Sequence, residues 1–111
     1  MTHSDIWRLS ATDLTTLTRR GDLSATEAVQ ASIDRMDEVN PDLNAVVEDL
    51  RTEALERAHS LDHVRASGQA TGPLHGVPVT IKVNVDQKGH ATTNGVVALK
   101  DVIAPDDAPI V

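Results

Sequence analysis

Lys82 is the residue whose type and place in this sequence most clearly suggest chemistry. It lies mid-way through Val79-Thr-Ile-Lys-Val-Asn-Val85, where apolar and polar residues alternate as they do on a β-strand. Burial among valine and isoleucine side chains would favour the neutral amine, because charge is costly in an apolar environment. A neutral lysine can take a proton from a hydroxyl nucleophile. The pattern also allows a second interpretation, in which Lys82 is a solvent-facing charge that guards a sheet edge.

The histidines and glycines predict neither a metal site nor a phosphate site. His59 and His63 lie four residues apart on a predicted helix, a spacing that can bring two imidazoles to one metal ion. Position 60 is not glutamate and no further ligand is evident, so we expect a solvated helix face and no metal. Gly72 and Gly76 precede Lys82, but in a P-loop the lysine directly follows the last glycine. We therefore exclude nucleotide binding.

Three helices are predicted before this lysine, over residues 11–20, 25–39 and 50–67. The first follows a capping serine, Ser10, and stops at Gly21. The second follows the capping box Ser24-Ala-Thr-Glu27 and is expected to end before Pro41, because the residue preceding a proline disfavours the helical conformation. The third carries apolar residues at spacings of three and four.

Strands are predicted over residues 43–47 and 79–85. Helices alternating with strands indicate an α/β fold. Two or three strands leave edges that need pairing or cover, so we expect residues 1–111 to belong to a larger domain. The segment Asp106-Asp-Ala-Pro109 predicts the opening of another helix, since an acidic cap is followed by proline. The type of the apolar segment 95–99 stays open.

Composition narrows the classes of function. Ten basic against 17 acidic residues give a net charge of −7, which disfavours binding to a phosphate backbone. The chain has no cysteine and a single aromatic residue, Trp7, so its core must be thin and built from aliphatic side chains. We find no secretory signal and no apolar run long enough to cross a bilayer, and we expect a soluble, cytoplasmic protein.

Several motifs in order resemble the amidase signature family, and the resemblance covers nearly the whole chain. The matching segments are the helix opening at Ser10-Ala-Thr-Asp-Leu14, the cap Gly21-Asp-Leu-Ser-Ala-Thr-Glu27, Val39-Asn-Pro-Asp-Leu-Asn-Ala45, the loop Gly72-Pro-Leu-His-Gly-Val-Pro78, Lys82, Thr92-Thr-Asn-Gly95 and Ala104-Pro-Asp-Asp-Ala-Pro-Ile-Val111. The loop histidine, His75, has a turn-stabilising role in this interpretation.

The resemblance implies an amidase-signature fold, a large mixed sheet between helices, with residues 1–111 as the N-terminal segment of a single domain. It implies hydrolysis of carboxylic amides by a Ser–cis-Ser–Lys triad through an acyl-enzyme, without a metal or organic cofactor. Lys82 matches the catalytic lysine and would be the base. The triad serines of the family lie downstream of Val111, so we expect this segment alone to be inactive. By family position, Asn94 and Gly95 line the substrate pocket, although a plain turn is an equal alternative.

Two departures from the family bear on the choice of function. Val83 stands where the family most often has aspartate after the lysine, and Thr92-Thr-Asn-Gly95 differs from the amidotransferase A subunits of the family. The second departure favours a stand-alone amidase over an amidotransferase A subunit, which stays an alternative. A non-catalytic scaffold or binding fragment is the other alternative. The expected partners are a small-molecule amide, the rest of the amidase domain and, as an open option, a second copy of the chain in a homodimer, with no nucleic acid and no membrane.

Overall fold

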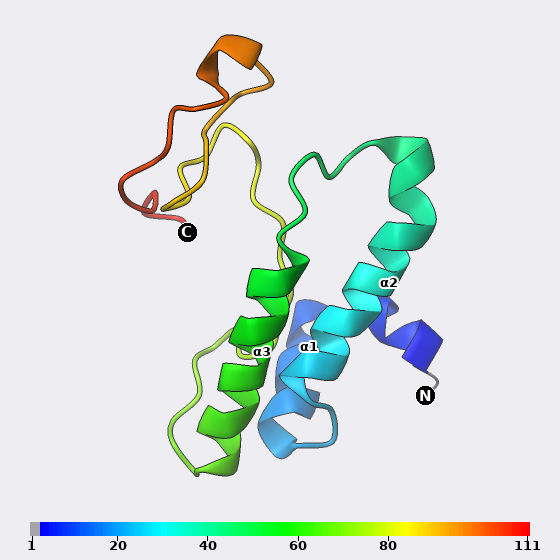
Figure 1. The fold of residues 1–111 in the computed structure, drawn as a ribbon. Coiled ribbons are helices and arrows are strands. Elements are labelled where there is room, and N and C mark those ends of the chain that lie inside the picture. Colours follow the sequence, from blue (N-terminus) through cyan, green and yellow to red (C-terminus); the bar gives the residue numbers. More distant parts are fainter. Residues whose placement is uncertain (1–2) are drawn as a thin grey trace. The chain divides into compact units, whose positions relative to one another are not determined.

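The protein is described by a computed structural model that covers residues 3–111. Its elements are η1 (His3–Arg8), α1 (Ala11–Arg20), α2 (Ala25–Leu43), α3 (Arg51–Ala66) and η2 (Val97–Leu99). The chain divides into two compact parts, an N-terminal unit that ends at Pro78 and a C-terminal unit, Val79–Val111. In the N-terminal unit α2 packs against both α3 and η1, and Figure 1 shows α1, α2 and α3 side by side.

The starts of α1 and α2 follow the predicted capping signals. Ser10 accepts the backbone N–H of Asp13 at 3.1 Å, and Gly21 ends α1 in the left-handed region at φ 80°. Ser24 and Glu27 form the reciprocal capping box of α2, with the Glu27 carboxylate accepting the Ser24 N–H at 2.8 Å. These bonds satisfy N–H groups that the first helical turn leaves free. The predictions for α1 and for the start of α2 are confirmed, and α3 lies within one residue of its predicted bounds at each end.

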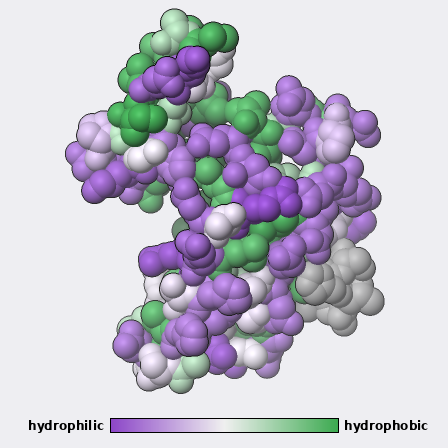
Figure 2. Space-filling model, viewed as in Figure 1, coloured by the Kyte–Doolittle hydropathy of each residue, from purple (hydrophilic) through white to green (hydrophobic). Residues whose placement is uncertain are grey.

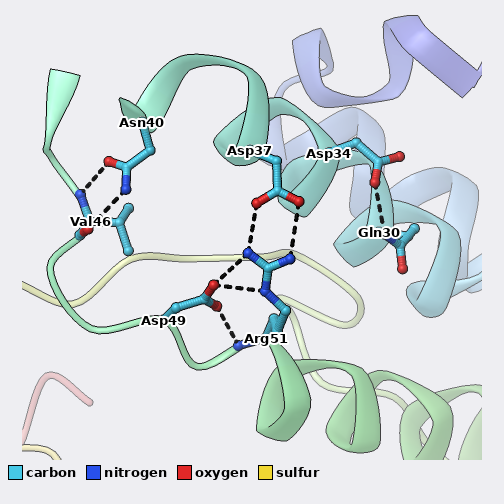
Figure 3. Close-up of polar contacts among 7 residues, drawn as sticks. All are labelled: Gln30, Asp34, Asp37, Asn40, Val46, Asp49 and Arg51. Atoms are coloured by element: carbon cyan, nitrogen blue, oxygen red, sulfur yellow. Dashed lines mark hydrogen bonds and ion pairs between the residues drawn. The ribbon is translucent and has the colours of Figure 1, made fainter. Parts of the chain in front are cut away.

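The end of α2 differs from the prediction, because the helix continues through Pro41 to Leu43. A proline in the last turn removes only one intrahelical hydrogen bond, and the Asn40 side chain binds the backbone that follows. Its Oδ1 accepts the N–H groups of Ala45 and Val46 at 2.9 Å each, and its Nδ2 donates to the Val46 carbonyl at 3.0 Å (Figure 3). The strand predicted over residues 43–47 is therefore not formed, since this cap occupies its backbone groups.

Two small aliphatic clusters form the core of the N-terminal unit. The first joins η1, α1 and α2 through Ile6, Leu14, Leu23, Ala28 and Ala31. The second joins α2 to α3 through Ala25, Val29, Ile33 and Ala58. Alanine at four of these nine positions lets the helices approach closely but buries little apolar area per residue. The thin aliphatic core expected from the composition is confirmed.

The C-terminal unit contains irregular backbone, η2 and one antiparallel bridge between Ala91 and Ile103. The strand predicted over residues 79–85 is not formed, because no other segment among the described residues pairs with it as a neighbouring strand. Its alternation persists in burial: Ile81, Val83 and Val85 are half-buried, and Lys82 lies exposed between them. The mixed sheet of the expected fold therefore stays a prediction.

Apolar side chains remain on the surface of the C-terminal unit. Val97 and Ile110 are 80% and 86% exposed, and Figure 2 shows hydrophobic atoms at the surface around η2. The helix opening predicted at Asp106-Asp-Ala-Pro109 is wrong for this structure, in which residues 106–111 form bends and a turn. A single proline and its cap do not supply the i→i−4 bonds of a helix.

Candidate functional site

The structure brings the predicted base and the predicted substrate-binding turn to neighbouring backbone. The Asn94 N–H donates to the Val83 carbonyl at 3.1 Å, so the turn lies against the residue that follows Lys82. The Lys82 carbonyl accepts the Val85 N–H at 2.9 Å, and its side chain is exposed. An exposed amine differs from the buried one that a neutral base requires. The base role of Lys82 therefore stays a prediction.

Asn94 and Gly95 form a tight turn. Both have positive φ, 48° and 75°, and the Val96 N–H donates to the Thr93 carbonyl at 2.8 Å. Two central residues with positive φ and a closing i→i+3 bond are typical of type I′ turns, for which Asn-Gly is the preferred pair. The plain-turn alternative thus accounts for both residue types, and the substrate-binding role of Asn94 and Gly95 stays a prediction.

Side chains that the sequence reasoning did not single out hold the C-terminal unit together. The Thr92 hydroxyl donates to the Asp86 carboxylate at 2.5 Å, and the Asp107 carboxylate accepts the Lys88 N–H at 2.7 Å. The Ala108 N–H donates to the Asp86 carbonyl at 2.9 Å. The sequence signal for these contacts is the placement of aspartates among turn residues, which identifies no partner.

The loop before Lys82, residues 72–78, is docked on α1. Thr18 is fully buried, and its hydroxyl donates to the His75 carbonyl at 2.7 Å. Arg19 donates from Nη2 to the Gly72 carbonyl at 3.1 Å. Gly76 has φ 75°, and a Cβ there would lie 2.8 Å from Thr18 Cγ2. Sequence reasoning missed Thr18, because a threonine in a helix carries no sign of a partner 57 residues away.

His75 lies inside this loop and closes a turn, as expected from its position. Its N–H donates to the Gly72 carbonyl at 3.2 Å, and the Val77 N–H donates to the Leu74 carbonyl at 3.1 Å. The side chain is 4% exposed, and its Nε2 has no hydrogen-bond partner among the described residues. The turn-stabilising role predicted for His75 agrees with these contacts.

The predicted solvated face of α3 has a structural residue between its two histidines. His59 and His63 are exposed, whereas the Asp62 carboxylate accepts the N–H groups of Ala25 and Thr26, at 2.7 and 3.1 Å, at the start of α2. Burial of Asp62 raises its pKa, but these bonds, one from the Thr26 hydroxyl at 2.6 Å and the nearby charge of an arginine outweigh it, so the net pKa is lowered. Across residues 3–111 we find no cluster of three metal-ligating side chains.

A shallow cavity of about 340 Å³ lies between the end of α2 and the start of α3. Its charged lining is internally paired: Arg51 binds Asp37 through two hydrogen bonds of 2.6 and 3.0 Å and also binds Asp49 (Figure 3). The hydrogen bonds from Arg51 lower the pKa of both carboxyl groups, and the two carboxylates raise the pKa of Arg51. This pairing makes the cluster a structural clamp between the two helices.

Comparisons with known proteins decide the family. A model of the Amidase family matches residues 27–111. The chain belongs to this family. It is 56% identical over 106 residues to an indoleacetamide hydrolase of Bradyrhizobium diazoefficiens, which covers 96% of the chain and 20% of that protein. It is 38% identical over 111 residues to an acylamidase of Rhodococcus erythropolis, covering 100% of the chain and 23% of that protein.

Amidotransferases of the family are also among the relatives. The chain is 36% identical over 107 residues to the A-type component of the glutamyl-tRNA(Gln) amidotransferase of Moorella thermoacetica. That match covers 96% of the chain and 22% of the relative. The relatives therefore include both stand-alone amide hydrolases and a component of an amidotransferase.

A solved structure supports the same fold. A bacterial aryl acylamidase of the amidase signature family superposes with a TM-score of 0.82 at 34% identity, over 88% of the chain and 20% of that enzyme. The resemblance inferred from the motifs is confirmed, and the chain spans about a fifth of the length of the relatives it matches. No helix within residues 3–111 has the length and apolar character needed to cross a membrane.

Proposed function

We propose that the intact protein hydrolyses the C–N bond of a carboxylic amide, with Lys82 as the base of a Ser–cis-Ser–Lys relay. The observation that carries this proposal is the 56% identity to an indoleacetamide hydrolase. The family match across residues 27–111 supports it, because that range includes Lys82 and the loop before it. Indoleacetamide, a small primary carboxamide, is accordingly the first substrate to assay.

In the proposed reaction Lys82 Nζ accepts a proton from the bridging serine, which deprotonates the nucleophilic serine. That serine attacks the amide carbonyl, the amine leaves with a proton, and water then hydrolyses the acyl-enzyme. A base that works at neutral pH must be partly unprotonated, so the exposed Lys82 has to be covered by the remaining four-fifths of the domain. We therefore expect residues 1–111 alone to show no turnover above background.

The amidotransferase component stays a second candidate, favoured by the 36% identity to the Moorella thermoacetica relative. Such a protein would pass ammonia to an acceptor bound by partner chains instead of releasing it. Co-purification of the intact protein separates the two candidates, because a stand-alone amidase releases ammonia from its substrate without partner chains.

The experiment is a pair of lysine substitutions in the intact protein. Lys82→Ala should lower the rate of ammonia release from indoleacetamide by about 10²–10⁴-fold, the usual contribution of a general base. Lys88→Ala is the matched control, since Lys88 is another exposed lysine six residues further along. Circular dichroism should show the same helix content in both variants. A Lys82→Ala enzyme with a near-normal rate would support the scaffold alternative, in which this lysine is a surface charge.

A further inference from the structure

We propose that Thr18 is a positioning residue for Lys82 and acts through the loop 72–78. This inference rests on the proposed function, since it concerns the same base. Thr18 is 0% exposed, and its hydroxyl bond to the His75 carbonyl, 2.7 Å long, joins positions 57 residues apart. A helical threonine ordinarily bonds a carbonyl of its own helix, and that acceptor, Thr15, lies at the longer distance of 3.2 Å.

Both branches of the Thr18 side chain contact the loop. The hydroxyl satisfies a buried carbonyl that would otherwise lose its hydrogen bond, which is costly inside a protein. The methyl group packs on Gly76 so closely that an added Cβ would lie 2.8 Å from it, with Ala25 Cβ at 3.2 Å on the other side. A β-branched side chain in a helix is held in one or two rotamers, so this surface is stiff. Thr18 thereby determines how close the loop lies to α1 and in which register.

A second bond and the length of the chain transmit that position. Arg19, the next residue of α1, donates to the Gly72 carbonyl at 3.1 Å, so the loop is attached at its start and near its middle. Lys82 follows Pro78, the last loop residue, by four positions. Four residues span at most about 13 Å, so a shift of the loop leaves little slack before the base. A displacement of about 1 Å at a reacting group can cost 10²-fold in rate.

The test compares two threonines of α1 in the intact protein. Thr18→Val removes the hydroxyl and nearly preserves the shape, and Thr18→Ser keeps the hydroxyl. Thr16→Val is the matched control, because the Thr16 hydroxyl bonds only within α1, to the Thr12 carbonyl at 2.8 Å, and is exposed. We expect Thr18→Val to lower kcat for indoleacetamide about 10-fold or more with KM little changed. Thr18→Ser should retain most of kcat, and Thr16→Val should match the unaltered enzyme.

Three outcomes decide between the inference and the function on which it rests. If Lys82→Ala keeps its activity, the proposed function fails. If Lys82→Ala is inactive but Thr18→Val has the same kcat as Thr16→Val, the positioning role is overturned and the function stands. If Thr18→Val does not fold, Arg19→Gln replaces it, since this exposed residue holds the same loop. An unchanged kcat in Arg19→Gln overturns the positioning role, and a fall in kcat with KM preserved supports it.

Discussion

Gly76→Ala tests how tightly the loop 72–78 is packed on the helices. Alanine at φ 75° pays about 1–2 kcal/mol for the left-handed conformation. Its Cβ would also lie 2.8 Å from Thr18 Cγ2 and 3.2 Å from Ala25 Cβ, and a buried threonine and a helix backbone have to move to make room. Overpacking of this kind adds about 1–3 kcal/mol. We therefore expect a total loss of about 2–4 kcal/mol in the free energy of unfolding.

Gly68→Ala is the control for the backbone part of this cost. Gly68 has the same φ of 75° and lies past the end of α3, where an added Cβ meets no atom within 4 Å. Urea unfolding of the two variants, followed by circular dichroism, should place Gly76→Ala about 1–3 kcal/mol below Gly68→Ala. Equal losses in the two variants would refute the reasoning, because they would mean that the loop does not pack on α1 and α2 as the structure has it.

Two further predictions concern charged groups of the helices. Asp62→Ala should lower the free energy of unfolding by about 1–2 kcal/mol, because it removes the acceptor of two N–H groups at the start of α2. Since the folded-state pKa of Asp62 is lowered, its contribution is complete above the ordinary aspartate pKa of about 3.9 and is lost as pH falls through the folded pKa; urea unfolding at pH 3 to 7 should show less acid dependence in the variant. Arg51→Gln should raise the pKa of Asp37 and Asp49 toward their ordinary values in an NMR titration, whereas Arg35→Gln, which breaks a separate ion pair, should leave both unchanged.

The helices were predictable because their signals are local. The caps at Ser10 and Ser24 and the left-handed Gly21 all involve bonds between residues a few positions apart, so residue types alone identify them. The end of α2 was not, because the preference of the residue before Pro41 was weaker than the cap supplied by Asn40. Propensity is a weak signal where a side chain can replace the missing backbone bonds.

The strands depended on partners that alternation cannot supply. The pattern around Lys82 correctly separated half-buried from exposed positions, yet a strand also needs a neighbour to accept its backbone bonds. The Asn94-Gly95 turn was readable from its dipeptide, whereas its bond to Val83, which brings it beside the predicted base, was not. Residue type therefore identified the candidate chemistry, and tertiary contacts decided what lies next to it.

By itself, the sequence determined the helix starts, the tight turns and the family, because each rests on residue types at short, regular spacings. The tertiary structure alone decided that Asp62 of α3 caps α2 and that Thr18 of α1 holds the loop before Lys82. Those contacts join residues 37 and 57 positions apart, and no local pattern encodes them. They form only when the aliphatic clusters bring the helices together, since burial removes the water that would otherwise satisfy the same polar groups.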